Sequence, residues 1–162
     1  MATKIQYEIF KAVYDEEAGR YSALESRSKL YLTILTFYLG ALAFKIEDVM
    51  KFVSQFRVPL WLYMSISLVV LLSLLLTILA TRIREFEGIC DLEQVVDSFG
   101  TDAPSDEDFL DDRLADLVVA TKRNSIQNDK IAKCLQWASY MLFVAVLLQL
   151  FVFVFAISNS RS

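Results

Sequence analysis

The sequence has no histidine, and its 162 residues include only two cysteines, two prolines and four glycines. A protein without histidine lacks the commonest general base and the commonest metal ligand of enzymes. Cys90 and Cys134 lie far apart in sequence, so a disulfide framework is not expected, and we interpret both as packing residues. The scarcity of proline and glycine favours long helices.

Catalytic sequence motifs are also missing. There is no G-x-S-x-G, no P-loop and no C-x-x-C. The acidic cluster 106–112 lacks the order and the glycine turn of an EF-hand, so we interpret it as a helix start with a solvated face. The net charge is −4 with acids and bases mixed, which argues against nucleic-acid binding. We therefore predict a protein that is not an enzyme and that holds no cofactor or metal.

Long uncharged stretches are what the sequence does contain, and hydrophobic residues make up 56% of it. Residues 59–81, PLWLYMSISLVVLLSLLLTILAT, carry no charge and no glycine, and their only proline stands first, where a helix tolerates it. About 20 apolar residues in a helix cross the hydrocarbon core of a bilayer. Residues 59–81 therefore predict a transmembrane helix.

Two further stretches predict membrane spans. Residues 134–157 carry no charge over a length sufficient to cross a bilayer. Residues 30–46 are shorter and carry a single charge, on Lys45, whose side chain can reach the membrane interface. The chain is thus expected to have three transmembrane helices.

The remaining segments carry most of the charges. They are an amphipathic cytoplasmic helix, an external connection, a cytoplasmic helical segment and a tail, at residues 1–29, 47–58, 82–133 and 158–162, respectively. Gly100 and Pro104 break the helical pattern, and Ser105 with Asp108 resembles a capping box that starts a new helix. The predicted fold class is an all-α membrane protein: three transmembrane helices with long cytoplasmic helical extensions.

The basic residues are unevenly distributed between these segments. Five precede the first predicted span, and three lie from Lys45, near the end of that span, up to the second. Seven lie between the second and third spans, and one follows the third. Lysine and arginine are in excess on the cytoplasmic side of membrane proteins. We therefore place the N-terminus and residues 82–133 in the cytoplasm, where both cysteines would lie in a reducing compartment.

No charged residue lies in the middle of a predicted span, although proton relays and voltage sensors usually need one. The uncharged polar residues that we select there, as pore-lining or interhelical candidates, are Gln149, Gln136, Ser139, Thr33 and Thr36. Interhelical hydrogen bonding is the commoner role of such residues, and a pathway through an oligomer is the alternative. The Gln149 amide needs a partner, which the same chain or a ring of protomers can supply.

A second set of polar residues forms a candidate site for an anion or a protein partner on the cytoplasmic side. These residues are Arg20, Arg27, Lys122, Arg123, Asn124 and Asn128. Arginine is well suited to binding phosphate. Solvated or paired surface charges are the commoner explanation for such a set.

Two passages of the sequence resemble a known pattern. YEIFKAVYDEEAGRYSALESRSKLYLTILTFYLGALAF is a helix rich in acids, arginine and tyrosine that runs into the first span, and ATKRNSIQNDKIAKCLQWASYMLF leads into the last span. Together they are similar to small bacterial membrane proteins of anti-phage defence loci, of which the SLATT group is the best known. That group usually has two spans, whereas this chain has a third predicted span. The resemblance implies an effector that a cytosolic sensor protein or a nucleotide signal activates.

From this resemblance and the missing catalytic groups, we expect an oligomeric inner-membrane effector that disrupts or depolarises the bacterial membrane when activated, in anti-phage defence. A homo-oligomer is expected because three helices enclose no pathway of their own. The alternatives are a non-conducting anchor that recruits a cytosolic partner, and a holin-like lysis protein. The long cytoplasmic segment argues against the holin.

Overall fold

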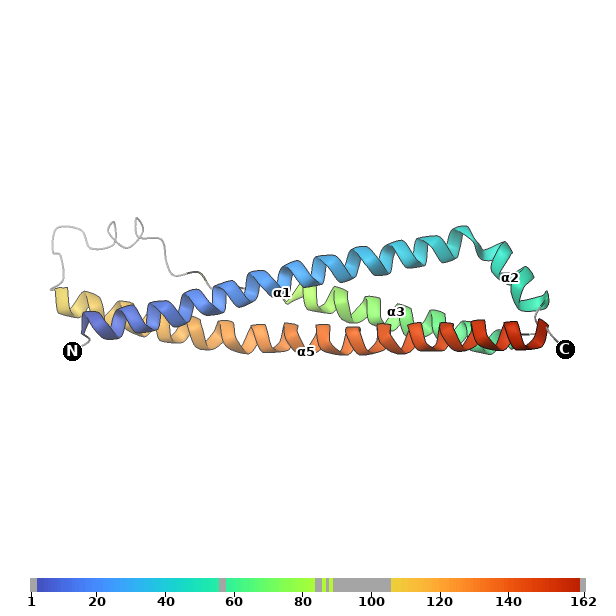
Figure 1. The fold of residues 1–162 in the computed structure, drawn as a ribbon. Helices are drawn as coiled ribbons and strands as arrows, with labels where there is room; N and C mark the ends of the chain where they lie inside the picture. Colours follow the sequence, from blue (N-terminus) through green and yellow to red (C-terminus); the bar gives the residue numbers. More distant parts are fainter. Residues whose placement is uncertain (1–2, 56–57, 84–85, 87, 89–105, 161–162) are drawn as a thin grey trace. The chain divides into compact units, whose positions relative to one another are not determined.

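The computed structural model describes residues 3–55, 58–83, 86, 88 and 106–160, and every regular element in these residues is an α-helix (Figure 1). The helices are α1 (Lys4–Phe44), α2 (Ile46–Gln55), α3 (Leu60–Arg82) and α5 (Asp106–Ser160). The all-α part of the predicted fold class is therefore confirmed. The predicted break at Gly100 and Pro104, the capping box at Ser105 and the position of Cys90 lie outside the described residues.

Packing divides the chain into two compact units. One unit consists of Met1–Glu25 and Ile83–Lys130, and we call it the polar unit. The other consists of Ser26–Arg82 and Ile131–Ser162, and we call it the apolar unit. Helices α1 and α5 each contribute residues to both units, whereas α2 and α3 lie in the apolar unit alone.

Helix α1 begins at a reciprocal cap that the sequence analysis did not identify. The backbone N–H of Thr3 donates to Oε1 of Gln6 at 2.9 Å, and the backbone N–H of Gln6 donates to Oγ1 of Thr3 at 3.3 Å. This T-x-x-Q pair satisfies two of the backbone donors that a helix start leaves unpaired. From this cap, α1 continues through Phe44 without a break between its charged and its apolar half.

The chain bends sharply after α1. Lys45 separates α1 from α2, and the axes of the two helices differ by 68°. The Lys45 ammonium lies 3.1 Å from the carboxylate of Asp48, three residues further along the chain. Residues 47–58, which we predicted as a connection, therefore contain a short helix. Helix α3 follows Pro59 and ends at Arg82, close to the stretch 59–81 that the sequence indicates.

The buried face of α5 repeats every seven residues. Its buried positions at this spacing are Leu117, Asn124, Ile131, Ala138, Ala145 and Val152. Further buried residues lie three or four positions away, including Ala120, Asn128, Leu135 and Ala156. A seven-residue repeat of buried positions is the pattern of left-handed coiled-coil packing. Within the polar unit, two of these buried positions are asparagines.

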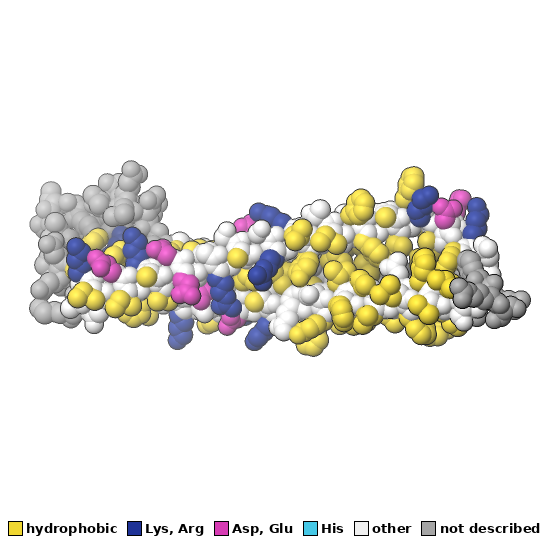
Figure 2. All heavy atoms as spheres, viewed as in Figure 1, with side chains coloured by type: hydrophobic (Ala, Val, Ile, Leu, Met, Phe, Trp, Pro, Cys, Tyr) yellow, Lys and Arg dark blue, Asp and Glu magenta, His cyan; other side chains and the backbone are white. Residues whose placement is uncertain are grey.

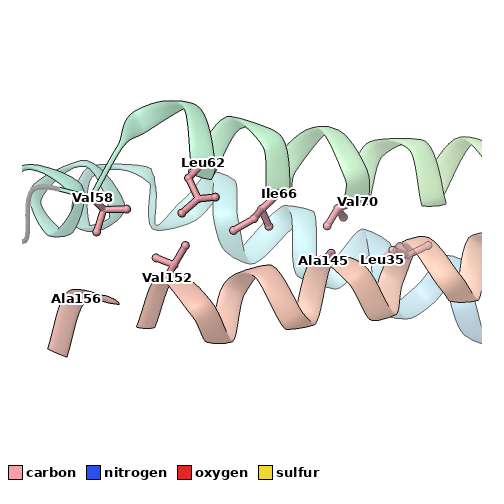
Figure 3. Packing of buried hydrophobic residues seen from close by; sticks show 8 residues of the cluster. All are labelled: Leu35, Val58, Leu62, Ile66, Val70, Ala145, Val152 and Ala156. Carbon is pink, nitrogen blue, oxygen red and sulfur yellow. The ribbon is translucent and has the colours of Figure 1, made fainter. Parts of the chain in front are cut away.

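The core of the apolar unit lies where α1, α3 and α5 meet (Figure 3). Its buried residues are Leu35, Val58, Leu62, Ile66, Val70, Ala145, Val152 and Ala156. The α5 side of this core includes two alanines, whereas the α3 side consists of larger branched residues. Small residues at a helix interface let the two backbones approach closely, which is typical of packing between membrane helices.

Two helices are long and apolar enough to cross a membrane. They are Leu60–Arg82 and the part of α5 within Phe109–Ser158. Helix α1 meets this criterion only when it is taken together with α2 across their bend, so the described residues offer two candidate spans, or three if the bent pair forms one. Figure 2 shows hydrophobic side chains over the visible surface of the apolar unit. These helix lengths support a membrane protein with at least two apolar helices.

Candidate functional site

Gln149 of α5 has a hydrogen-bond partner on α1 of the same chain. The hydroxyl group of Tyr38 donates to Oε1 of Gln149 at 2.7 Å, and both residues are half-buried in the apolar unit. Sequence analysis indicated that Gln149 needs a partner but did not identify Tyr38. Because this bond joins two helices of one chain, the amide oxygen is satisfied without a second protomer.

A second polar contact joins α3 to α5. The Ser73 hydroxyl donates to the backbone carbonyl of Ala138 at 2.9 Å, and both residues are buried. One turn further along α3, the Thr77 hydroxyl donates to the Ser73 carbonyl at 2.9 Å. These contacts let α3 and α5 pack at a small-residue seam while their hydroxyl groups stay paired. Ser73 and Thr77 are not among the five candidates selected from the sequence, although both lie in the predicted span 59–81.

The other selected span residues make local contacts or lie at the surface. The Thr33 hydroxyl donates to the Lys29 carbonyl one turn earlier in α1, at 2.9 Å, and Thr36 is exposed. The Gln136 amide donates to the Tyr140 hydroxyl within α5 at 3.2 Å, and Ser139 is half-buried. The structure does not bring these residues together into one polar site.

In the polar unit, Arg20 is held by two acidic residues. Its guanidinium donates to Oδ1 of Asp129 at 2.6 Å and lies 3.6 Å from Oε1 of Glu17. The hydrogen bond to Asp129, assisted by the charge of Glu17, raises the pKa of Arg20 above its ordinary value. The folded state therefore favours the charged guanidinium, and this contribution is lost only as the pH rises through that raised pKa. Two neighbouring carboxylates offset the positive charge that an external anion would need.

Asn128 connects α5 to the same part of α1. Its side-chain amide donates to the backbone carbonyl of Glu17 at 3.0 Å and to Oε2 of Glu17 at 2.6 Å. Asn128 is fully buried, and its own oxygen Oδ1 has no hydrogen-bond partner. Asn124, one turn earlier, is also buried. Glu17 was not among our candidates, because a glutamate on an amphipathic helix resembles a solvated residue.

The remaining members of the predicted anion site lie apart from this cluster or at the surface. Arg27 is exposed and belongs to the apolar unit, so it does not share a unit with the other five. Lys122 and Arg123 are exposed on α5. Lys122 borders a groove of about 370 Å³ between α1 and α5, whose apolar lining includes Phe10 and Val118. The structure therefore pairs part of the predicted site with acids and places another part beside an apolar groove.

A buried arginine was also missed by the sequence analysis. The Arg113 side chain is 8% exposed; its carbon Cζ lies 5.5 Å from the centroid of the Phe109 ring, and Nη1 lies 4.0 Å from the Asp116 carboxylate. Its Nη2 has no hydrogen-bond partner, and the same holds for Oγ1 of Thr121. Such unpaired buried groups cost folding free energy. Within the described residues, no group of three or more Cys, Asp or Glu side chains is placed to hold a metal ion.

Comparison with known proteins gives no relative. No family model, no curated protein and no solved structure matches this chain.

Proposed function

We propose that this protein is an oligomeric effector of the bacterial inner membrane that disrupts or depolarises the membrane when activated, in anti-phage defence. In this proposal the chain crosses the membrane three times, with residues 30–46 providing the first span and α2 lying at the outer interface. The N-terminus and residues 82–133 lie in the cytoplasm, where a sensor protein or a nucleotide signal acts on them. The proposed activity is not enzymatic.

Membrane insertion is supported by the surface of the apolar unit. Large hydrophobic side chains there are strongly exposed, for example Phe37 at 79%, Phe44 at 85% and Trp61 at 67%. A continuous apolar surface of this kind is costly in water and marks contact with lipid or with another protein. Lipid contact on every span accounts for exposure on α1, α3 and α5 together.

The observation that carries the oligomer proposal is that a single chain leaves no polar pathway between its own helices. Gln149 accepts from Tyr38, and Ser73 donates to Ala138. The core between the three helices is filled by residues such as Leu35 and Ile66 rather than by polar side chains. An ion pathway in this protein would therefore have to form between copies, or after these contacts open.

Leakage of vesicles tests the proposal. The full chain is reconstituted into liposomes of phosphatidylethanolamine and phosphatidylglycerol that enclose a fluorescent dye, and the same chain is expressed in bacteria that carry a membrane-potential dye. We expect dye release and loss of potential once the chain is activated or strongly overexpressed. Intact liposomes together with an unchanged potential would contradict an effector that permeabilises membranes.

The groove in the polar unit favours a second candidate, a membrane anchor that recruits a cytosolic partner. Val13 and Ile126 line it along with Phe10 and Val118, and Val13 and Ile126 are 41% and 50% exposed. An exposed apolar groove on a segment that lies in water is a common docking surface for an amphipathic helix. Replacing Ile126 by Asp would then abolish partner capture without affecting membrane insertion, whereas a purely membrane-acting effector would retain its leakage activity.

A further inference from the structure

The apolar unit contains a cavity of about 680 Å³ between α1, α2 and α3. Leu39 and Leu42 of α1, Val49 of α2, and Met64 and Leu68 of α3 line it. Several lining side chains are also largely exposed, with Met64 at 65% and Leu68 at 57%, so the cavity opens onto the outer surface of the helices. Its volume lies in the range of about 300–1,000 Å³ that is typical of sites for small molecules.

The lining offers little to a polar ligand. Its polar residues are Tyr63, Ser65 and Ser67, and the hydroxyl groups of the two serines are used within α3. Ser65 donates to the carbonyl of Trp61 at 2.8 Å, and Ser67 donates to the carbonyl of Tyr63 at 3.2 Å. An occupant that needs hydrogen bonds would be poorly satisfied here, whereas a hydrocarbon chain needs none.

The length of the cavity matches one leaflet of a bilayer. Its lining on α3 extends from Leu60 to Leu71. At a rise of 1.5 Å per residue this is roughly 16 Å, or about half of the ~30 Å hydrocarbon core. The charged residues Lys45, Asp48 and Lys51 of the α1–α2 bend and α2 are exposed and mark the headgroup end. A transmembrane helix from another copy would need the full thickness of the core.

We propose that this cavity binds one acyl chain of a phospholipid from the leaflet at the α2 end. The inference rests on the membrane insertion that the proposed function assumes. The cavity exists because α2 turns away from α1 by 68°, and α2 is anchored on α5 by the stacking of Phe52 on Phe153 at 6.3 Å between ring centroids. A bound acyl chain would therefore fill the space beneath this bend and stabilise the position of α2.

Photolabelling of the full chain in vesicles tests the acyl-chain site. The protein is reconstituted in phosphatidylethanolamine and phosphatidylglycerol with a small fraction of a phospholipid that carries a diazirine on one acyl chain. After irradiation, labelled peptides are mapped by mass spectrometry. We expect labelling of residues 39–50 and 60–71 to exceed that of the exposed α5 surface around Val154 at least threefold. Equal labelling of all exposed apolar surfaces would overturn the proposal.

A matched pair of variants tests whether the cavity itself is responsible. Leu68→Trp places a bulky ring in the cavity and should lower the labelling of residues 39–50 at least threefold. Leu75→Trp makes the same change on an exposed position of α3 outside the lining, where Leu75 is 48% exposed, and should leave this labelling unchanged. Leu68→Ala guards against misfolding of the tryptophan variant, because it opens the cavity and should preserve the label. Loss of the label in Leu68→Ala, or its persistence in Leu68→Trp, would contradict an acyl-chain site.

Two controls separate the remaining outcomes. The first uses Leu68→Cys in a background with Cys90→Ser and Cys134→Ser, and the protein is oxidised in the membrane. Efficient disulfide formation between copies would show that a second copy occupies the cavity, and this result would overturn the proposal. Alkaline carbonate extraction reports on insertion. A chain that is extracted refutes the proposed function along with this inference, whereas a chain that stays in the membrane but labels evenly refutes the acyl-chain site alone.

Discussion

Tyr38 on α1 donates a hydrogen bond to Gln149 on α5, and the two residues are 111 positions apart in sequence. In the polar unit, Glu17 and Asn128 are joined with the same separation of 111 positions. The equal separation means that α1 and α5 are parallel and pair in the same register in each unit. Buried asparagines in coiled coils have the same role, because their polar contacts fix the register between the helices.

The Tyr38–Gln149 bond should contribute measurably to the stability of the apolar unit. Tyr38→Phe and Gln149→Leu each remove one partner, and the double variant completes a thermodynamic cycle. Interhelical hydrogen bonds in membrane proteins contribute about 0.6 kcal/mol on average and at most about 1.7 kcal/mol. We expect a coupling energy in this range from unfolding in mixed micelles. A coupling energy of zero would mean that the bond adds nothing beyond the packing of the two side chains.

Sequence reasoning recovered the elements that depend on local composition alone. The uncharged stretch 59–81 nearly coincides with α3, because the length of an apolar run is visible without knowing its neighbours. Gln149 was recognised as a residue in need of a partner, but Tyr38 was not identified, since pairing depends on the register between two distant helices. Glu17 resembles a surface residue in sequence and is instead hydrogen-bonded to a buried asparagine, which only the packing of α1 against α5 reveals.

Asn128 should contribute more to the stability of the polar unit than an uncharged side chain usually does. Asn128→Ala removes the donor to the Glu17 carboxylate and carbonyl and leaves a partly buried charge without that partner. Leaving a buried polar group unsatisfied costs about 1–3 kcal/mol, so we expect a loss of this size in thermal or denaturant unfolding. Lys130→Ala, an exposed position on the same helix, is the control and should change stability by less than about 0.5 kcal/mol. Equal effects of the two substitutions would argue against the contact.

The Arg20–Asp129 ion pair should contribute little despite its short distance of 2.6 Å. The two side chains are 41% and 57% exposed, and ion pairs of this kind typically contribute about 0.2–1 kcal/mol because water and salt screen them. We expect Arg20→Gln to lower the free energy of unfolding within that range at low salt, with the difference shrinking at high salt. A larger effect that does not depend on salt would indicate that Arg20 supports Glu17 and Asn128 through packing.

Ala145 should tolerate no larger side chain. It is 3% exposed and lies in the core where α1, α3 and α5 meet, in one cluster with Leu35 and Val70 (Figure 3). Ala145→Leu forces extra methyl groups into a packed core, which typically costs about 1–3 kcal/mol. The neighbouring Val146 is 48% exposed, so Val146→Leu makes a change of similar chemistry on the outer surface and should be nearly neutral. Unfolding of both variants in mixed micelles compares them directly. If Ala145→Leu were as stable as the unmodified chain, the three helices would have to be less closely packed in the membrane than the buried core indicates.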